Sequence, residues 1–356
     1  MKTLGIAANG EGMGHASRLV TLVPLLAQNY SLVVYAPPTI HGFLLQKLPQ
    51  LADGTIPLRT LPHLHLAKRG DQITYVRTIT ENLPTLTKLR TLLQRVRAQL
   101  IKDHIDVLIS DFEPFSAWAA MGAGIPTLQI NHPGIVSRSG SISLQALATK
   151  WIAGLMMGPY DKRILVSFFD GDTGPMIRQE IQQAPRGNDG SLVVYVKPGY
   201  RRGIVRALEQ LKIENYHLFP NPAMNYAQAL GRCKAIIAGG GHQTISEALY
   251  LGKPILAIPQ RGQFEQWLNS VMLERGGFGK MGMLRRLRKD LGTFLSEVEQ
   301  GQFPKKSQIP WVRYRTGNET DKVLRKIHSF VHRSSATRKQ LWFIPQSSRW
   351  GIPSGL

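Results

Sequence analysis

The feature that most constrains the fold is a repeated alternation of short apolar runs with helix-forming segments. In the first half, apolar runs at 4–8, 31–35, 107–110 and 126–130 are separated by segments such as 16–28, whose apolar side chains recur every three or four residues. Strands that alternate with helices in this way are typical of parallel βαβ units. The sequence therefore predicts an α/β protein built on parallel sheets.

The second half repeats the alternation, and the 356 residues are enough for two domains. We expect two doubly wound, Rossmann-like domains, residues 1–185 and 186–330, that face a central cleft, followed by a basic tail at 331–356. A stretch rich in Gly, Asp and Pro at 170–190 is typical of a boundary. Further strands are predicted at 191–196, 216–219, 234–238 and 254–258, and helices at 85–102, 115–122, 203–211, 225–230, 244–251 and 263–275.

The charge is strongly basic, with a net value of +21 that is concentrated in the second half. Such a surface suits nucleic acid, an anionic membrane or phosphate-bearing substrates, and charge alone does not choose among them. The single cysteine, Cys233, excludes a disulfide framework and a cysteine-based zinc cluster. No run approaches the ~20 apolar residues of a membrane-spanning helix, and no signal-peptide pattern is present, so we expect a cytoplasmic protein.

The candidate site lies in the loops that follow the strands, because open α/β sheets bind ligands beyond the carboxyl ends of their strands. The first loop is glycine-rich, and Gly12 and Gly14 are predicted to bind the donor because they let the backbone approach a ligand closely. His15 then falls at a helix start and is a candidate base. Asp111, at the end of another strand, could orient His15 or cap the next helix, and these two roles are compatible.

The second half carries the most specific motif, a triple glycine between a strand and a helix. Free amides at that helix N-terminus would bind an anion, and the Thr244 hydroxyl would add to them. Glu247 could bind ribose hydroxyls or could form a capping box with Thr244. Neighbouring loops add cations that suit a diphosphate and polar groups that suit sugar hydroxyls. The predicted donor-binding residues of this half are Lys197, Gly199, Arg201, Gly239, Gly240, Gly241, Gln243, Thr244, Glu247, Glu265 and Gln266.

Together these motifs resemble the GT-B glycosyltransferases. The similarity is greatest to the group that contains the lipid-carrier N-acetylglucosaminyltransferase of peptidoglycan synthesis and the nucleotide-sugar glycosyltransferases of natural products. It covers roughly residues 1 to 330 and is most specific in 239–269, which reads Gly-Gly-x-x-Thr-x-x-Glu-Ala-Leu-x-x-Gly-x-Pro and then Glu-Gln-x-x-Asn. In plant-type relatives a phosphate-binding histidine stands where this chain has Gly239, and that role is not carried over to His242.

The resemblance implies residue roles. Gly240, Gly241 and Thr244 would contact the diphosphate of the donor and Glu247 its ribose. Glu265 and Gln266 would hold the donor sugar, and His15 would deprotonate the acceptor hydroxyl. The implied reaction is an inverting, metal-independent transfer from a nucleoside-diphosphate sugar, with a UDP-sugar as co-substrate and no cofactor.

The acceptor is not identified by the resemblance, and we expect a small molecule or a lipid-linked group. The first domain binds the acceptor in this family, which draws attention to 61–75 and 151–157. Basic clusters could bring the protein to an anionic membrane surface. The residues of interest are His63, His65, Lys68 and Arg69 in the first region, Lys280, Arg285, Arg286, Arg288 and Lys289 in the second domain, and Arg338, Lys339, Trp342 and Trp350 in the tail.

Two other functions remain open at this point. A nucleotide-sugar 2-epimerase would share the fold but would act on the donor without an acceptor. A nucleic-acid-binding protein would explain the charge, but aromatic residues do not interleave with the basic runs and no known binding motif is found. Nucleic acid is therefore not an expected partner.

Overall fold

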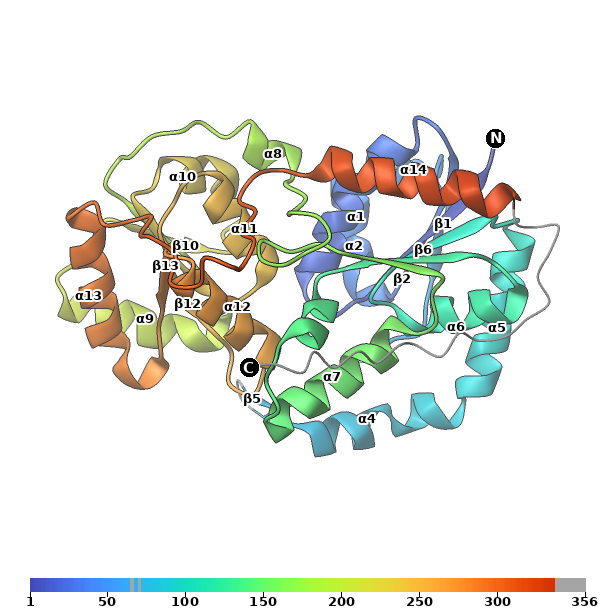
Figure 1. The fold of residues 1–356 in the computed structure, drawn as a ribbon, viewed down its shortest axis with the longest axis horizontal. Coiled ribbons are helices and arrows are strands. Elements are labelled where there is room, and N and C mark those ends of the chain that lie inside the picture. Colours follow the sequence, from blue (N-terminus) through green and yellow to red (C-terminus); the bar gives the residue numbers. More distant parts are fainter. Residues whose placement is uncertain (65–66, 70–71, 337–356) are drawn as a thin grey trace.

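The computed structural model describes residues 1–64, 67–69 and 72–336, and these fold around two large parallel sheets (Figure 1). The first sheet has the order β3-β2-β1-β6-β7-β8, and the second has the order β10-β9-β11-β12-β13. The α/β class and the two Rossmann-like domains predicted from the sequence are confirmed. The strands are β1 Thr3–Ala8, β2 Ser31–Ala36, β3 Leu58–Thr60, β6 Val107–Asp111, β7 Thr127–Asn131, β8 Lys162–Leu165, β9 Leu192–Tyr195, β10 Tyr216–Phe219, β11 Ala235–Gly239, β12 Ile255–Ile258 and β13 Gly279–Met281. In a separate two-stranded sheet, β4 Lys68–Arg69 pairs antiparallel with β5 Gln72–Ile73.

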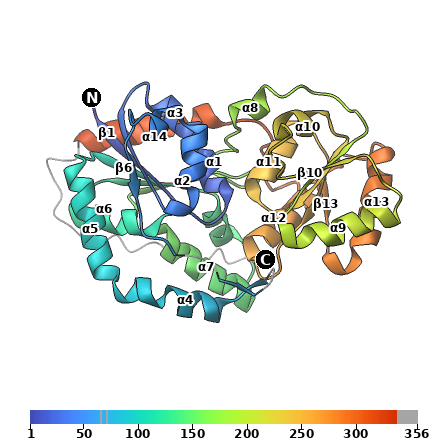
Figure 2. The same ribbon diagram turned by 180° about the vertical axis from the view of Figure 1, so that it is seen from behind.

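Helices cover both faces of each sheet (Figures 1 and 2). On β1, for example, Ile6 faces a core that includes helix α1, whereas Ala7 faces a second core that includes α5 and α6. Burial on both faces explains the continuous apolar runs of the sequence. The helices are α1 Met13–Leu26, α2 Pro38–Lys47, α3 Pro49–Ala52, α4 Tyr75–Thr87, α5 Leu89–Lys102, α6 Pro114–Ala123, α7 Leu144–Met157, α8 Gln179–Gln182, α9 Pro198–Gln210, α10 Tyr226–Arg232, α11 His242–Tyr250, α12 Phe264–Arg275, α13 Leu287–Glu299 and α14 Thr320–Ala336, with 3₁₀ turns at Pro133–Arg138 and Leu284–Arg286.

Helix α14 packs on the first domain, although the predicted domain boundary assigns most of it to the second. Val323, Ile327 and Phe330, assigned to the second domain by the 186–330 boundary, belong to the core of the first sheet together with Leu4 and Ile6. Figure 1 shows α14 lying along the first sheet beside α1. The apolar side chains of α14 pack against this core, and the sequence pattern alone does not show which domain a terminal helix packs on. The basic tail predicted at 331–356 is wrong at its start, because residues 331–336 form the end of α14 and Val331 lies in the same core. The rest of that prediction, 337–356, lies outside the described residues.

The single helix predicted at 85–102 is divided in the structure. Helix α4 ends at Thr87 and α5 begins at Leu89, because Lys88 leaves helical geometry at φ −99° and ψ 9°. Val96 and Leu100 are buried as expected, but Leu86 and Leu89 are exposed. The inward orientation predicted for those two leucines is therefore wrong.

Two helices at the carboxyl edge of the second sheet begin earlier than predicted. Helix α9 begins at Pro198 rather than at 203, as suits a proline in the first turn, so Gly199 and Arg201 lie in a helix and not in a loop. Helix α11 begins at His242 rather than at 244, with Gly241 as its N-cap. These earlier starts bring both helix N-termini directly to the ends of their strands.

Candidate active site between the two sheets

His15 and Asp111 form a buried hydrogen-bonded pair at the carboxyl edge of the first sheet. His15 lies in the first turn of α1, Asp111 ends β6, and His15 Nδ1 is 2.8 Å from Asp111 Oδ1. Because the carboxylate is an acceptor, Nδ1 carries the proton and Nε2 is left as the basic nitrogen. Phe112 stacks on the imidazole, with 5.8 Å between ring centroids. The pair has the arrangement of a general base and its orienting group.

Asp111 is held ionised by a residue that sequence reasoning missed. Arg18, one turn after His15 on α1, donates from Nε to Oδ2 at 2.6 Å and from Nη2 to Oδ1 at 2.8 Å. Burial by itself raises the pKa of the Asp111 carboxyl, but Arg18 and His15 hold it below its ordinary value. The three-residue spacing from His15 was the signal in the sequence, since it places both side chains on one helix face.

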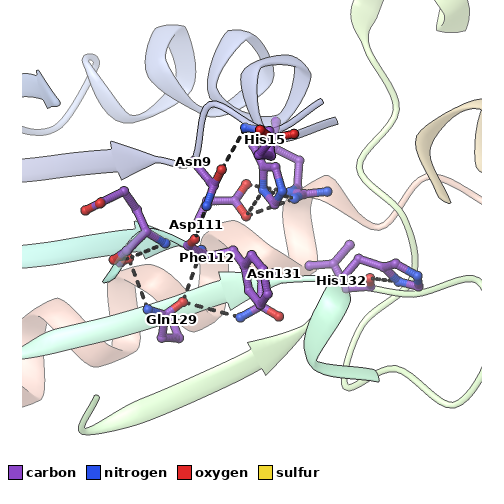
Figure 3. A network of polar contacts seen from close by, with 12 residues as sticks. Asn9, His15, Asp111, Phe112, Gln129, Asn131 and His132 are labelled. Carbon is purple, nitrogen blue, oxygen red and sulfur yellow. Dashed lines mark hydrogen bonds and ion pairs between the residues drawn. The ribbon is translucent and has the colours of Figure 1, made fainter. Parts of the chain in front are cut away.

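The glycine-rich loop is tied to the residue that follows Asp111. Asn9 donates through Nδ2 to the Phe112 carbonyl at 2.8 Å, and its Oδ1 accepts from the Glu11 amide at 2.7 Å. Figure 3 shows Asn9, His15 and Asp111 converging, with Gln129 and Asn131 in the next part of the network. Phe112 adopts φ +58°, which turns its backbone toward this network. The capping role considered for Asp111 belongs instead to Glu113, which accepts from the amides of Phe115 and Ser116.

Two buried histidines connect the domains. His132, which follows β7, stacks on His242 of α11 with 3.8 Å between ring centroids, and its Nε2 is 2.9 Å from Asn269 Oδ1. Burial lowers the pKa of His132 to about 3 and also lowers that of His242 well below its ordinary value. Both rings are therefore neutral at neutral pH. Their stacking places the first residue of α11 close to the first domain.

The three glycines differ in the space that surrounds them. A Cβ on Gly240 would lie 2.5 Å from the Gln266 carbonyl oxygen, so this glycine allows β11 to pack against α12. A Cβ on Gly239 or Gly241 would meet nothing within 4 Å. No side chain caps α11, so its first amides are available to a ligand. Thr244 lies in that same first turn.

Glu247 is engaged by a residue from outside the motif. Arg178 donates from Nε to Oε1 at 2.7 Å and from Nη2 to Oε2 at 2.9 Å, and Gln243 also donates to Oε1. The capping box considered for Glu247 and Thr244 is not formed. A ribose would therefore have to use the remaining lone pairs of Glu247 or displace Arg178.

The Glu265-Gln266 pair lies in the first turn of α12, close to His132. Glu265 Oε1 is 3.8 Å from His132 Nε2. Burial raises the pKa of the Glu265 carboxyl to about 7, against the opposite effects of Arg18 and Asn269. Gln266 accepts a hydrogen bond from the Gln260 amide at 2.9 Å and thereby shapes the preceding loop.

The cations at the start of α9 are tied to neighbouring loops. Lys197 donates to Gln260 at 2.7 Å, and Arg201 donates through Nη2 to the Pro220 carbonyl at 2.9 Å. Both therefore lie at the carboxyl edge of the second sheet. Of the residues proposed for the acceptor, His65 lies outside the described residues.

The fold and these strand-end residues define a class, the GT-B glycosyltransferases. Two Rossmann-like domains present a glycine-capped helix N-terminus on one side and a histidine–aspartate pair on the other. The chain belongs to glycosyl transferase family 1, because the model of that family matches residues 3–299.

Curated relatives cover shorter regions. An uncharacterised glycosyltransferase of Methanosarcina acetivorans is 30% identical over 31% of this chain and 36% of its own length. An uncharacterised glycosyltransferase of Methanosarcina mazei is 28% identical over the same shares. The match thus spans about a third of the length of these relatives.

Solved structures similar to this chain cover almost all of it. LpCGTa in complex with UDP gives a TM-score of 0.61 at 13% identity, covering 93% of this chain and 100% of that one. Phytolacca americana UGT2, complexed with UDP-2fluoro-glucose and pterostilbene, gives 0.61 at 15% identity over 92% and 99%. Acinetobacter baumannii MurG gives 0.55 at 15% identity over 92% and 100%. At these identities the similarity establishes the fold alone.

Proposed function

We propose that the protein transfers a sugar from a nucleoside diphosphate, preferentially UDP, to an acceptor hydroxyl, with inversion at the anomeric carbon. His15 takes the acceptor proton at Nε2 while Asp111 fixes the imidazole through Nδ1. The nucleoside diphosphate leaves with its charge against the amides that begin α11. Thr244 assists there, Glu247 contacts the ribose, and Glu265 and Gln266 contact the transferred sugar.

The observation that carries this proposal is the His15–Asp111 hydrogen bond of 2.8 Å, across from an N-terminus of α11 that no side chain caps. Helices α1 and α11 contact each other, so the base and the anion site lie close together. The presence of UDP in solved structures of the same fold supports the choice of nucleotide. Lys197 and Arg201 add positive charge at the edge of the same sheet.

Thermal unfolding in the presence of nucleotides tests the donor. We expect UDP and a UDP-sugar to raise the Tm, since a ligand at 100 times its Kd adds about 2.7 kcal/mol to the free energy of unfolding. UMP, which lacks the second phosphate, should give a smaller shift. Equal shifts with UDP and UMP would contradict a diphosphate site at α11. Incubation of a UDP-sugar without acceptor separates transfer from epimerisation, because only an epimerase would interconvert the donor alone.

For the acceptor we propose a lipid-linked hydroxyl at an anionic membrane. Helix α7 exposes an apolar stripe, Leu144, Leu147, Trp151 and Leu155, whose spacing of three or four residues places it on one face, and Trp151 is 72% exposed. Figures 1 and 2 place α7 and α4 along the same edge of the first domain. Exposed cations on α5 and at its N-cap complement an anionic surface. These are Lys88, Arg90, Arg95, Arg97 and Lys102.

Sedimentation with vesicles checks the membrane contact. We expect the protein to bind vesicles containing phosphatidylglycerol, and Trp151→Ser to weaken binding about tenfold through lost apolar burial. Trp311→Ser is the matched control, because Trp311 is 75% exposed but lies between α13 and α14. Equal loss in both variants, or none, would contradict the assignment to α7. No described helix is long and apolar enough to cross a bilayer.

A further inference from the structure

Arg18 is a buried cation whose charge is directed at the His15–Asp111 pair. It is only 3% exposed, and it holds both oxygens of Asp111. Its Nη2 is also 2.8 Å from His15 Nδ1. Because Nδ1 carries a proton and a guanidinium only donates, this is a close approach of two N–H groups, and Asp111 is the hydrogen-bond partner of the ring. A proton on the imidazole would therefore interact electrostatically with both the Asp111 carboxylate and the Arg18 guanidinium.

The two neighbours of His15 have opposite electrostatic effects. A carboxylate beside an imidazole favours the imidazolium, whereas a guanidinium beside it disfavours the imidazolium. With Arg18 paired to Asp111, the charges next to the ring add to zero. Other titratable groups come from further elements packed around this site, namely Glu11, His63, His132, His242 and Glu265.

We propose that Arg18 is a positioning residue that cancels the charge of Asp111, so that the carboxylate orients His15 without leaving an uncompensated negative charge beside the ring. This inference rests on the proposed role of His15 as base. A histidine–aspartate pair without the arginine would orient the ring equally well. It would also hold a proton to higher pH, and that proton would block its action as a base.

The protonation midpoint of His15 tests the proposal without a substrate. Histidine-labelled protein is titrated by NMR, and the His15 signal is identified by its absence from His15→Ala. We expect Arg18→Gln to move the midpoint up by about one pH unit, because the cation is lost while the carboxylate stays. Arg18→Lys keeps the charge and should move it little.

A double variant provides the control for folding and for charge. Arg18→Gln leaves a buried carboxylate without its partner, which can prevent folding. Arg18→Gln combined with Asp111→Asn removes both charges and should return the midpoint to near the wild-type value. An unchanged midpoint in Arg18→Gln, or a midpoint in the double variant no closer to the wild-type value, would overturn the proposal.

The same variants give a kinetic readout that separates this inference from the proposed function. In Arg18→Gln the acid limb of the kcat/KM profile should move to higher pH by the same amount, whereas a merely structural loss would lower activity equally at all pH values. If the wild-type protein transfers no sugar but the NMR shift appears, the charge-cancelling role stands and the proposed function fails.

Discussion

Replacing His15 with alanine should lower kcat for sugar transfer about 1,000-fold while leaving UDP binding unchanged. His15 Nε2 is the basic nitrogen of a ring that Asp111 fixes through a 2.8 Å hydrogen bond. Among the described residues, only Asp111 and Arg18 bring polar atoms within hydrogen-bond distance of the His15 ring, so its loss removes the base without removing donor contacts. Steady-state kinetics together with the UDP-induced Tm shift measure the two effects separately.

Asp111→Asn is the matched variant, because it keeps the size of the side chain but removes the charge that favours proton transfer to His15. We expect a smaller loss of kcat, about 100-fold, with UDP binding again retained. Normal turnover by His15→Ala would show that another group is the base. A parallel loss of UDP binding in both variants would instead show that the pair supports the fold of the cleft.

Gly241→Ala should weaken UDP binding by about tenfold or more while the protein still folds. The backbone at Gly241 has φ −72° and ψ 132°, which alanine readily adopts, and a Cβ there meets no atom within 4 Å. The added methyl group projects into the space in which we place the diphosphate. Isothermal titration with UDP measures the loss, and the Tm without ligand should stay within a few degrees of wild type.

Gly240→Ala is the contrasting change at the adjacent position. Its Cβ would lie 2.5 Å from the Gln266 carbonyl oxygen and 2.9 Å from Gln266 Cβ, so β11 and α12 must separate. We expect the free energy of unfolding to fall by about 1–3 kcal/mol. If Gly241→Ala bound UDP as well as wild type does, the diphosphate would have to lie elsewhere than at the N-terminus of α11.

Much of the candidate site could be predicted from the sequence, because its residues follow strands that the apolar runs identify. His15, Asp111 and the triple glycine each follow a short apolar run, and parallel strands end at one edge of their sheet. The predicted positions of β10 and of the strand that precedes the triple glycine agree with the structure to within a residue. Helix starts were less accurate at 203 and 244, since helix ends depend on a few local backbone angles.

The sequence by itself determined two parallel sheets and the strand ends at which His15, Asp111 and Gly241 stand, because side-chain alternation and apolar spacing are local properties. Only the tertiary structure decided how these residues are partnered. Arg18 donates hydrogen bonds to Asp111, and Arg178 donates to Glu247. His132 stacks on His242, and α14 packs on the first sheet. Contacts between residues far apart in the chain depend on how helices and strands pack and on strand register, and a local sequence pattern does not specify either of these.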